Sequence, residues 1–528
     1  MGDPPTTKRG SRDRGPAEGR HLGRRGAAAA TRRVEHLRVE PAKRGDRCCS
    51  LRPAKGTFHK CVITCLDTRM AELPPPRKAR GGVLIVGGGF GGVTVARELG
   101  WRGATIVNVQ NSMLFTPMLP EVAGGIIDMR NAMTPLAMVC PHAEIIPGRV
   151  TDLALKHRHA EVQTDGGLRL RIEYDNVVVA VGAVPRTFPI PGLTEYAVGC
   201  NTVLDALYLR NQLLRLLAAA EAEPDPERRR RHLTFVFVGA GFAGVEALAE
   251  LHCLAQDALR YHPTLRDVPQ RWILVEGAPK ILGQIPSRLG QYVQDRLGQL
   301  GVELRLGTRL VTVVDGRAAL SDGTECDAGM LVWTAGVRAN PVVSHFGLPE
   351  DERGRVRVGP TLQVEGYDDV WALGDCAAVP NEANHGDIDP PTSQHALRQG
   401  RRLGKNLLAL QEGRAPQSYN FRSLGQVATL GRKEGIADLR GIRLTGLSGW
   451  LAARAVHLMQ VPRRPQRIGV IGNWAASLFF PGNLVTVAGL VDAPSLGTGS
   501  APPVASPVRL PEPPNAAPLI EDGGHFCR

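Results

Sequence analysis

The stretch Val83-Leu84-Ile85-Val86-Gly87-Gly88-Gly89-Phe90-Gly91-Gly92 decides the fold of this chain. Four aliphatic residues precede Gly87-x-Gly89-x-x-Gly92, and a helical pattern follows. In such a strand, turn and helix, the first glycine permits the tight turn. The second lets the backbone approach a pyrophosphate, and the third lets the helix pack on the strand. The stretch predicts a dinucleotide site on a parallel sheet; the alternative is a turn that is merely rich in glycine.

A second stretch has the same construction. The apolar run Thr234–Val238 leads into Gly239-x-Gly241-x-x-Gly244 and a second helical pattern. Its glycines carry the same three roles. Two such turns, about 150 residues apart, are far more specific than one. They predict a flavin site and a nicotinamide site on one chain.

Two polar residues follow the strands that come after these turns. Glu276 ends the run Trp272–Val275, where a carboxylate can accept hydrogen bonds from the adenosine ribose and repel a 2′-phosphate. That placement favours NADH over NADPH, and the alternative is a solvated glutamate at a strand end. Asn108 stands at the equivalent place after the first turn, where it can bond a ribose hydroxyl without charge.

The rest of the foldable chain alternates short aliphatic runs with helical patterns. Residues 203–222 predict a helix, with an apolar stripe of leucines at 204, 207, 213, 214 and 217. The aliphatic runs predict strands that are buried on both faces. They are Val83–Val86, Val177–Val181, Leu233–Val238, Trp272–Val275 and Met330–Trp333. This alternation predicts an α/β fold with doubly wound parallel sheets.

The positive charge of the chain is concentrated at one end. Of 64 Lys+Arg and 51 Asp+Glu residues in the 528-residue chain, 17 and 7 lie within residues 1–69, so the remainder has a net charge of only +3. The high overall charge therefore does not indicate a nucleic-acid binder, and no nucleic-acid partner is expected. The composition of residues 1–80 predicts a disordered basic tail, or one that is not translated if Met70 is the start. The prolines of residues 496–528 predict a second disordered tail.

Several other classes are disfavoured by pattern. The chain contains no apolar run of about 20 residues and no signal-peptide pattern, so no transmembrane helix or secretion signal is expected. Ten scattered cysteines fit a reducing compartment. Cys61-x3-Cys65, beside His59, lacks a second ligand pair at zinc spacing, and no metal site is predicted.

Further segments resemble the flavoproteins that carry two dinucleotide-binding domains. Tyr174–Gly182 resembles a strand and turn of that superfamily, Val370–Cys376 resembles the segment whose aspartate contacts FAD, and Leu331–Val337 resembles a segment of one branch. The resemblance implies that Gly182, Gly336, Gly374 and Asp375 bind cofactor.

That branch is the type II NADH:quinone oxidoreductases. The matches cover about 81–491 and include 111–123 beside the flavin, the helix 241–251, the quinone-side segment 391–400 and the C-terminal stretch 449–480. Three residues depart from the family pattern, namely Asn108, Ser393 and Arg398.

The resemblance implies two Rossmann-like dinucleotide-binding domains, for FAD and NADH, and a C-terminal amphipathic helical membrane-docking region. The predicted division is a tail at 1–80, the FAD domain at 81–200 and 330–410, the NADH-binding domain at 201–329, the docking region at 411–495 and a tail at 496–528. The implied cofactors are FAD and NADH. The implied reaction passes a hydride from NADH to flavin and electrons to a membrane quinone, without proton pumping.

Two other functions stay open at this point. One is a related FAD reductase with a soluble or sulfur acceptor, for which Cys140, Cys200 and Cys376 are the candidate cysteines. The other is a non-catalytic, nucleotide-sensing flavoprotein. Residues 111–130 contain no cysteine, which disfavours the dithiol chemistry of the superfamily's disulfide reductases.

The resemblance also implies the reacting side chains. Glu246 and Glu250 share one helix face; Glu246 is expected to contact NADH, and Glu250 to lie near the nicotinamide–flavin junction. Two solvated carboxylates are the alternative. Gln394 is expected to hydrogen-bond the flavin or the quinone, and His395 is a candidate proton donor to the quinol. The alternative for His395 is a packed histidine without catalytic duty.

The C-terminal stretch predicts membrane contact. Two short apolar helices at 450–461 and 468–480, each with a tryptophan, are joined by Arg463, Arg464 and Arg467. This pattern suits the plane of an anionic membrane surface, reached through residues 447–491, whereas a helical hairpin covering a core is the alternative. The expected location is peripheral, on the cytoplasmic face of a bacterial inner membrane, and the resemblance allows a homodimer.

Overall fold

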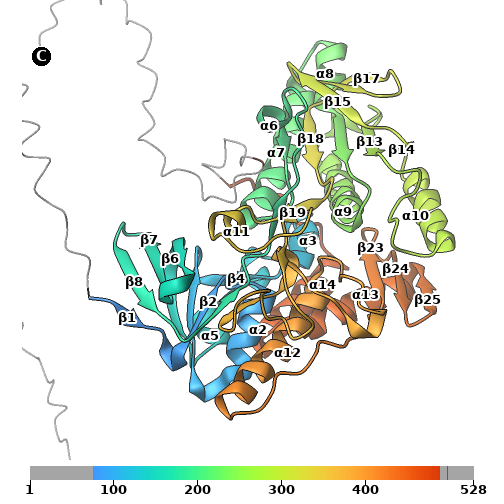
Figure 1. Ribbon diagram of the computed structural model, residues 1–528. Helices are drawn as coiled ribbons and strands as arrows, with labels where there is room; N and C mark the ends of the chain where they lie inside the picture. Colours follow the sequence, from blue (N-terminus) through green and yellow to red (C-terminus); the bar gives the residue numbers. More distant parts are fainter. Residues whose placement is uncertain (1–74, 488–495, 497–528) are drawn as a thin grey trace, which may run out of the picture. The chain divides into compact units, whose positions relative to one another are not determined.

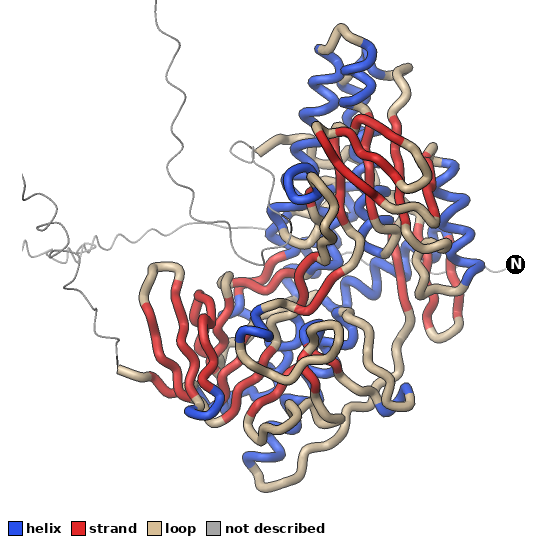
Figure 2. The backbone as a smooth tube through the Cα atoms, turned by 45° about the horizontal axis from the view of Figure 1, so that its top comes forward, coloured by secondary structure: helices blue, strands red, loops and turns tan. Residues whose placement is uncertain are grey.

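Two large sheets, one mixed with a parallel centre and one parallel throughout, form the framework of the chain, with helices packed around them (Figure 1). The computed structural model describes residues 75–487 and Leu496, which belong to one unit, Glu72–Arg528. The strands of the two sheets stand out as separate groups in Figure 2. This arrangement confirms the predicted α/β class with two Rossmann-like parts.

The first sheet has eight strands in the order β1-β8-β7-β6-β3-β2-β9-β21. Its parallel centre places Val86 beside both Val107 and Val179, and every residue of β2 is buried. The strands are β1 (Arg77–Lys78), β2 (Val83–Val86), β3 (Thr105–Asn108), β6 (Glu144–Ala154), β7 (His159–Thr164), β8 (Arg169–Glu173), β9 (Asn176–Val179) and β21 (Val370–Ala372). Burial on both faces explains why this centre reads as continuous aliphatic runs.

The second sheet repeats the central strand order of the first. Its order β14-β13-β12-β18-β11 corresponds to β6-β3-β2-β9-β21, so the two glycine turns occupy equivalent places. The strands are β11 (Ala197–Val198), β12 (Thr234–Val238), β13 (Arg271–Glu276), β14 (Val302–Leu306) and β18 (Met330–Trp333), with an antiparallel meander of β15 (Leu310–Val314), β16 (Arg317–Leu320) and β17 (Glu325–Asp327). Because β11 and β18 pair here, this sheet extends beyond the predicted range 201–329 at both ends.

Two helices that lie far apart in the sequence pack tightly beside the first sheet. They are α2 (Phe90–Leu99) and α12 (Ser393–Gln411). A side chain at Gly400 would come within 2.7 Å of the Gly91 carbonyl oxygen, and one at Gly404 within 2.4 Å of the Glu98 side chain. Glycines four residues apart on α12 therefore let it approach α2, which brings the quinone-side segment beside the first glycine turn.

The helices of the second sheet include α7 (Val203–Ala222), α8 (Pro226–His232), α9 (Phe242–Ala258) and α10 (Ser287–Gln299). The range of α7 confirms the predicted helix at 203–222, and its start is fixed by a capping box between Thr202 and Asp205. Leu207, Leu213, Leu214 and Leu217 are buried as expected. Leu204 is exposed, because it lies in the first turn, before the helix meets the core.

The C-terminal region is a small antiparallel sheet with two helices. It contains β23 (Gln426–Thr429), β24 (Gly435–Leu439), β25 (Ile442–Thr445), α13 (Gly446–Gln460) and α14 (Arg464–Ser477). The predicted pair of helices exists, but Arg464 and Arg467 lie inside α14, so only Arg463 lies between the helices. Trp450 and Trp474 are buried within the protein, so these two rings do not form the surface that would contact a membrane.

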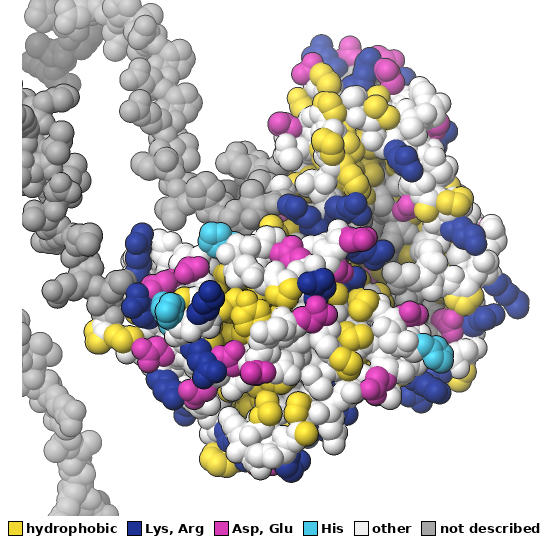
Figure 3. Space-filling model, in the orientation of Figure 1, with side chains coloured by type: hydrophobic (Ala, Val, Ile, Leu, Met, Phe, Trp, Pro, Cys, Tyr) yellow, Lys and Arg dark blue, Asp and Glu magenta, His cyan; other side chains and the backbone are white. Residues whose placement is uncertain are grey.

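Short elements join these parts. They are β4 (Ser112–Leu114) with β5 (Met133–Pro135), β10 (Ala183–Pro185) with β19 (Val337–Ala339), β20 (Val356–Arg357) with β22 (Ala377–Ala378), and α3 (Leu119–Ala123), α4 (Met129–Ala132), α5 (Leu136–Val139), α6 (Leu193–Tyr196) and α11 (Val342–His345). Lys/Arg and Asp/Glu side chains are interspersed over the face shown in Figure 3.

The predicted tails lie mostly outside the described residues, as does the Cys61–Cys65 pair. Where they are described, they are ordered: Arg77–Lys78 forms β1, and Leu496 is buried in the core of the second sheet. Both tails were therefore predicted a few residues too long. Among the described residues, no helix has the length and apolarity needed to cross a bilayer.

Candidate functional site

Close packing explains two of the three motif glycines in the first turn. Gly87 has a φ of 111°, and a side chain there would lie 2.3 Å from the Ala180 carbonyl oxygen. A side chain at Gly92 would lie 2.0 Å from the Gly87 carbonyl oxygen. At Gly89, no protein atom lies within 4 Å of that position. A side chain at Gly89 would fill open space at the start of α2, which is where a pyrophosphate approaches a turn of this type.

The second turn shows the same division. Gly239 has a φ of 107° and a side chain there would lie 2.6 Å from Thr334. One at Gly244 would lie 2.0 Å from the Gly239 carbonyl oxygen, whereas the space beside Gly241 is open. The residues of both turns thus fit a dinucleotide.

The polar residues at the ends of β3 and β13 contact these turns in the same way. Asn108 Oδ1 accepts a hydrogen bond from the Gly88 N–H at 2.8 Å. Glu276 Oε2 accepts one from the Ala240 N–H at 2.7 Å, and its Oε1 accepts one from the Ala278 N–H at 2.8 Å. Both side chains therefore lie at the turns and hold the backbone of the turn in the same way.

The remaining predicted cofactor residues lie at the carboxyl ends of neighbouring strands. Gly182 follows β9, Gly374 and Asp375 follow β21, and Gly336 follows β18. Gly182, Gly336 and Gly374 have positive φ angles of 69°, 98° and 75°, which only glycine adopts without strain. Burial raises the pKa of Asp375 to about 6. The first sheet thus gathers its candidate FAD residues at one edge, as open parallel sheets do for ligands.

His395 belongs to a buried polar network. Its Nδ1 lies 2.5 Å from Asp389 Oδ2 and 3.3 Å from the Tyr419 hydroxyl. Gln399 donates to the same Asp389 oxygen at 3.2 Å and accepts from the Gly374 N–H at 2.8 Å. With Nδ1 engaged, only Nε2 is available to a substrate. The network explains why a histidine at this place can serve packing alone.

Gln394 and Glu246 bind opposite ends of one segment, which runs from residue 424 through β23 to Thr429. Gln394 accepts from the Leu424 N–H at 2.7 Å and donates to the Gly425 carbonyl at 3.2 Å. Glu246 Oε1 accepts from the Thr429 N–H at 2.8 Å. Gln394 on α12 and Glu246 on α9 therefore both form hydrogen bonds to residues 424–429, and this C-terminal segment links the two helices.

Glu246 and Glu250 on α9 are both buried, so the alternative of two solvated glutamates is wrong. Burial raises the pKa of Glu246 to about 8, opposed by its hydrogen bond from Thr429 and reinforced by Glu121. Burial likewise raises the pKa of Glu250 to about 8, and Glu121 raises it further. Burial and the repulsion between neighbouring carboxylates both favour the protonated forms of Glu121, Glu246 and Glu250.

Sequence reasoning missed two members of this cluster. Glu121 lies on α3, within the segment quoted beside the flavin, and Arg454 lies on α13. They pair at 3.2 Å with both side chains almost fully buried. The family-like segment 111–123 could have drawn attention to Glu121, whereas no local pattern distinguishes Arg454 from a surface arginine.

The three cysteines of the sulfur-acceptor alternative are buried. Burial raises the thiol pKa of Cys140 and of Cys376 to about 11, and that of Cys200 to about 12. A thiolate is the reactive form of cysteine, so these positions are unsuited to persulfide chemistry at neutral pH.

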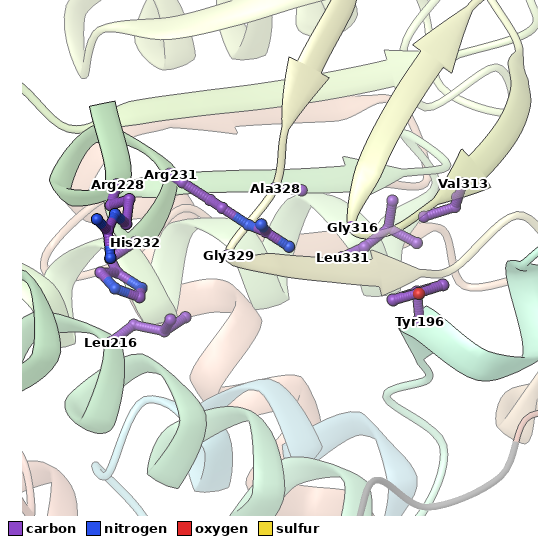
Figure 4. A pocket seen from close by; sticks show the side chains of 10 residues that line it. All are labelled: Tyr196, Leu216, Arg228, Arg231, His232, Val313, Gly316, Ala328, Gly329 and Leu331. Carbon is purple, nitrogen blue, oxygen red and sulfur yellow. The ribbon is translucent and has the colours of Figure 1, made fainter.

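A cavity of about 350 Å³ lies elsewhere, on the second sheet (Figure 4). Leu331 and Gly329 line it at the start of β18, and His232 lines it just before β12. These are the amino ends of the parallel strands, opposite the edge that carries Gly239 and Glu276. Open parallel sheets bind cofactors at their carboxyl ends, so this cavity is not the nicotinamide site.

Comparisons with known proteins agree with this geometry. The family model described as pyridine nucleotide-disulphide oxidoreductase matches residues 81–400. A type II NADH:quinone oxidoreductase, Ndh of Mycobacterium tuberculosis, is 31% identical over 421 residues, covering 76% of this chain and 89% of that protein. The mitochondrial internal alternative NAD(P)H-ubiquinone oxidoreductase A1 of Arabidopsis thaliana is 30% identical, covering 79% of this chain and 88% of the relative.

The fold has solved counterparts. The structure of NDH2 from Plasmodium falciparum in complex with NADH superposes with a TM-score of 0.70 at 17% identity, covering 78% of this chain and 99% of that one. A NAD-dependent persulfide reductase from A. fulgidus gives a TM-score of 0.54 at 20% identity. At these identities the likeness concerns the fold alone.

Proposed function

The chain belongs to the type II NADH:quinone oxidoreductases, and we propose that the two glycine turns and the C-terminal region carry out the reaction of that family. It transfers electrons from NADH to a quinone, with FAD as its cofactor and without pumping protons. The observation that carries the assignment of the sites is the duplicated turn, in which the second of the three motif glycines, Gly89 or Gly241, has open space beside it and the other two do not.

Each turn is assigned one cofactor. The α2 turn, with Asn108, Gly182, Gly374 and Asp375, would hold FAD, which supplies the hydride-accepting and electron-passing chemistry. The α9 turn, with Glu276 and Gly336, would hold NADH. The N–H groups at the start of each helix would bind the diphosphate, whose negative charge the helix dipole favours.

Glu276 would select NADH. Its carboxylate lies at the ribose end of the second turn, where it is held by the Ala240 and Ala278 N–H groups. A 2′-phosphate brought beside this charge would be repelled.

The quinone would approach the amino-terminal end of α12. Gln394 fixes residues 424–425 there, and His395 Nδ1 is held by Asp389, so both residues shape and support this end of the helix. Gln394 Nε2 carries a second N–H besides the one it donates to the Gly425 carbonyl, and this N–H would be the donor to flavin or quinone.

The C-terminal region would rest on a membrane. Exposed apolar side chains gather on α13, α14 and the residues after them. They are Leu447, Leu451, Met459, Ile468, Ile471, Leu478, Phe479 and Phe480. A surface of this kind binds lipid without spanning it, and quinones dissolve in lipid. Because bacterial NADH is cytoplasmic, we place the protein peripherally, on the cytoplasmic face of a bacterial inner membrane whose anionic lipids face Arg463.

Stopped-flow absorbance tests the reaction. NADH is expected to bleach the flavin band of the purified protein, and a short-chain quinone is expected to restore it. Ferredoxin or polysulfide should leave the reduced flavin unchanged. Reoxidation by either of these and not by quinone would contradict the function, as would a flavin that NADH does not reduce. Light scattering in detergent tests whether the protein is a homodimer.

A further inference from the structure

A buried arginine connects the C-terminal region to the carboxylates of the core. Arg454 on α13 is only 5% exposed, although an arginine is costly to bury. Its guanidinium lies 4.0 Å from the Trp450 ring centre and 4.5 Å from that of Trp474. The two buried tryptophans thus enclose the charge in an apolar, cation–π environment.

Glu121 ties three helices to that arginine. Its Oε1 lies 3.2 Å from Arg454 Nη2, and its Oε2 accepts a hydrogen bond from Trp474 Nε1 at 2.9 Å. Glu121 lies on α3, Arg454 on α13 and Trp474 on α14. Removing either charge would leave the other buried without its partner, which is strongly destabilising in proteins.

Glu250 lies beside this pair and has no such partner. It is 1% exposed, and neither carboxylate oxygen has a hydrogen bond to the described residues. A side chain at Gly124, the residue that ends α3, would come within 3.2 Å of Glu250 Oε2. The α3 segment therefore packs directly on a carboxyl group whose two oxygens are both unsatisfied. A neutral, protonated form is far less costly in such a place than a carboxylate.

The charged and titratable groups around Glu250 come from each neighbouring element. Glu121 acts on it from α3, Glu246 and Cys253 from its own helix, Arg432 from the loop after β23, and Arg454 from α13. Asp257 and His457 lie one step further out, next to Arg432 and Arg454 respectively. Arg432 forms an ion pair with Asp257. Both Arg454 and Arg432 therefore act on the Glu250 carboxyl, but Arg432 is already paired with Asp257, whereas Arg454 is paired with Glu121 of the same carboxyl cluster.

We propose that Arg454 is a positioning residue for quinone reduction, setting from the C-terminal helix how readily the Glu250 carboxyl releases and regains a proton. This inference rests on the proposed function. NADH delivers two electrons and one proton as a hydride, and a quinone needs two electrons and two protons. In each turnover the Glu250 O–H bond breaks, its proton ends on a quinone oxygen, and the carboxylate regains a proton from solvent.

Opposite shifts in one pH dependence distinguish this role from a merely structural one. The rate of quinone reduction should fall at high pH, where Glu250 has lost its proton; this fall is the alkaline limb of the pH profile. Arg454→Met removes a positive charge, so it should move this limb to higher pH by about one unit. Glu121→Gln removes a negative charge and should move the same limb downward. Glu250→Gln should abolish the limb. Arg454→Lys keeps the positive charge, so its limb should lie at the wild-type pH.

The experiment uses the full-length holoenzyme with NADH and a short-chain quinone. Since Arg454→Met leaves Glu121 without its cation, the double variant Glu121→Gln with Arg454→Met supplies a form with neither charge, whose limb should return toward wild type. Arg271→Met is the matched control, because Arg271 pairs with Glu303 on the second sheet, away from this cluster. It should leave the limb in place.

Infrared titration of the protonated carboxyl band provides a readout without quinone. The band should be lost in Glu250→Gln and should titrate at higher pH in Arg454→Met. Limbs that move in the same direction in the two charge variants, or an infrared midpoint that does not move, would overturn the inference. A wild-type enzyme that fails to reduce quinone while its infrared midpoints shift as expected would instead overturn the proposed function.

Discussion

Asn108 and Glu276 make the same hydrogen bond in the two halves of the protein. Each lies at the end of the strand next to a glycine turn, and each accepts from the N–H of the turn's middle residue, Gly88 at 2.8 Å and Ala240 at 2.7 Å. The departure of Asn108 from the family pattern therefore preserves the contact with the turn and removes only its charge. The two positions become matched sites for testing what charge contributes.

Glu276→Gln should weaken the preference for NADH. The change removes the charge that repels a 2′-phosphate, so the ratio of kcat/KM for NADH to that for NADPH should fall about tenfold, or about 1.4 kcal/mol. Steady-state kinetics with both nucleotides measure the ratio. Glu303→Gln, on the neighbouring strand β14, is the control and should leave it unchanged. An unaltered ratio in the Glu276 variant would show that the carboxylate only supports the turn.

Asn108→Ala should weaken FAD binding. The substitution removes the hydrogen bond to the Gly88 N–H and the 2.7 Å bond that Asn108 Nδ2 donates to the Gln110 carbonyl. At about 1 kcal/mol for each bond, the Kd for FAD should rise about tenfold or more. Asn108→Asp keeps the acceptor for Gly88 and should retain FAD better than the alanine variant. Fluorescence titration of the apoprotein measures both, and equal losses would contradict the role of the acceptor.

Glu250 should make the folded protein less stable as the pH rises. Its pKa is raised by burial from 4.5 to about 8, so its contribution to stability is complete below about pH 4.5 and is lost as the pH rises through about 8. Between about pH 5 and 9, the wild type should lose stability relative to Glu250→Gln by an amount on the order of 3 kcal/mol. Thermal unfolding at several pH values measures the difference. Parallel curves would show that Glu250 titrates normally.

Asp389→Asn should destabilise the fold around the first sheet. Although burial raises the pKa of Asp389, hydrogen bonds from His395 and Asn381 hold it below its usual value. The charge therefore stabilises the fold above about pH 4, and this stability is lost as the pH falls through the lowered pKa. At neutral pH the variant should lose about 2 kcal/mol. The matching variant His395→Gln should lower Tm while leaving the pH profile of quinone reduction in place; a lost limb would identify His395 as the proton donor.

Replacing Phe479 and Phe480 together by serine should weaken membrane binding. The two rings are 81% and 66% exposed, and burying one in lipid contributes about 2 kcal/mol, so binding to anionic vesicles should fall at least tenfold. Vesicle co-sedimentation measures this, and NADH oxidation by a soluble dye should persist. Trp101→Ser removes an equally exposed ring from the first sheet's α2 connection and is the control. These substitutions change exposed rings alone. Deleting 447–491 would also remove Arg454, the ion-pair partner of Glu121.

Local sequence patterns were sufficient to predict a strand or helix wherever the physical constraint acts within that one segment. The strands Val83–Val86 and Thr234–Val238 and the helix α7 follow from periodicity and capping, because burial on both faces and a 3.6-residue repeat leave direct marks in the chain. The tryptophans of α13 and α14 show the limit. The pattern of an amphipathic segment does not show which face packs against the core. Both rings lie inside the protein and enclose Arg454.

The sequence by itself determined the two glycine turns, their strand-end partners Asn108 and Glu276, and hence the class of cofactor chemistry. Each of these constraints acts within one strand, turn and helix, where φ angles and close backbone approach restrict the residue type. Only the tertiary structure decided the state of Glu121, Glu246 and Glu250, because their proton affinities depend on burial and on Arg454, which lies more than 200 positions away in the chain. Desolvation and charge pairing act through space, and no local pattern encodes them.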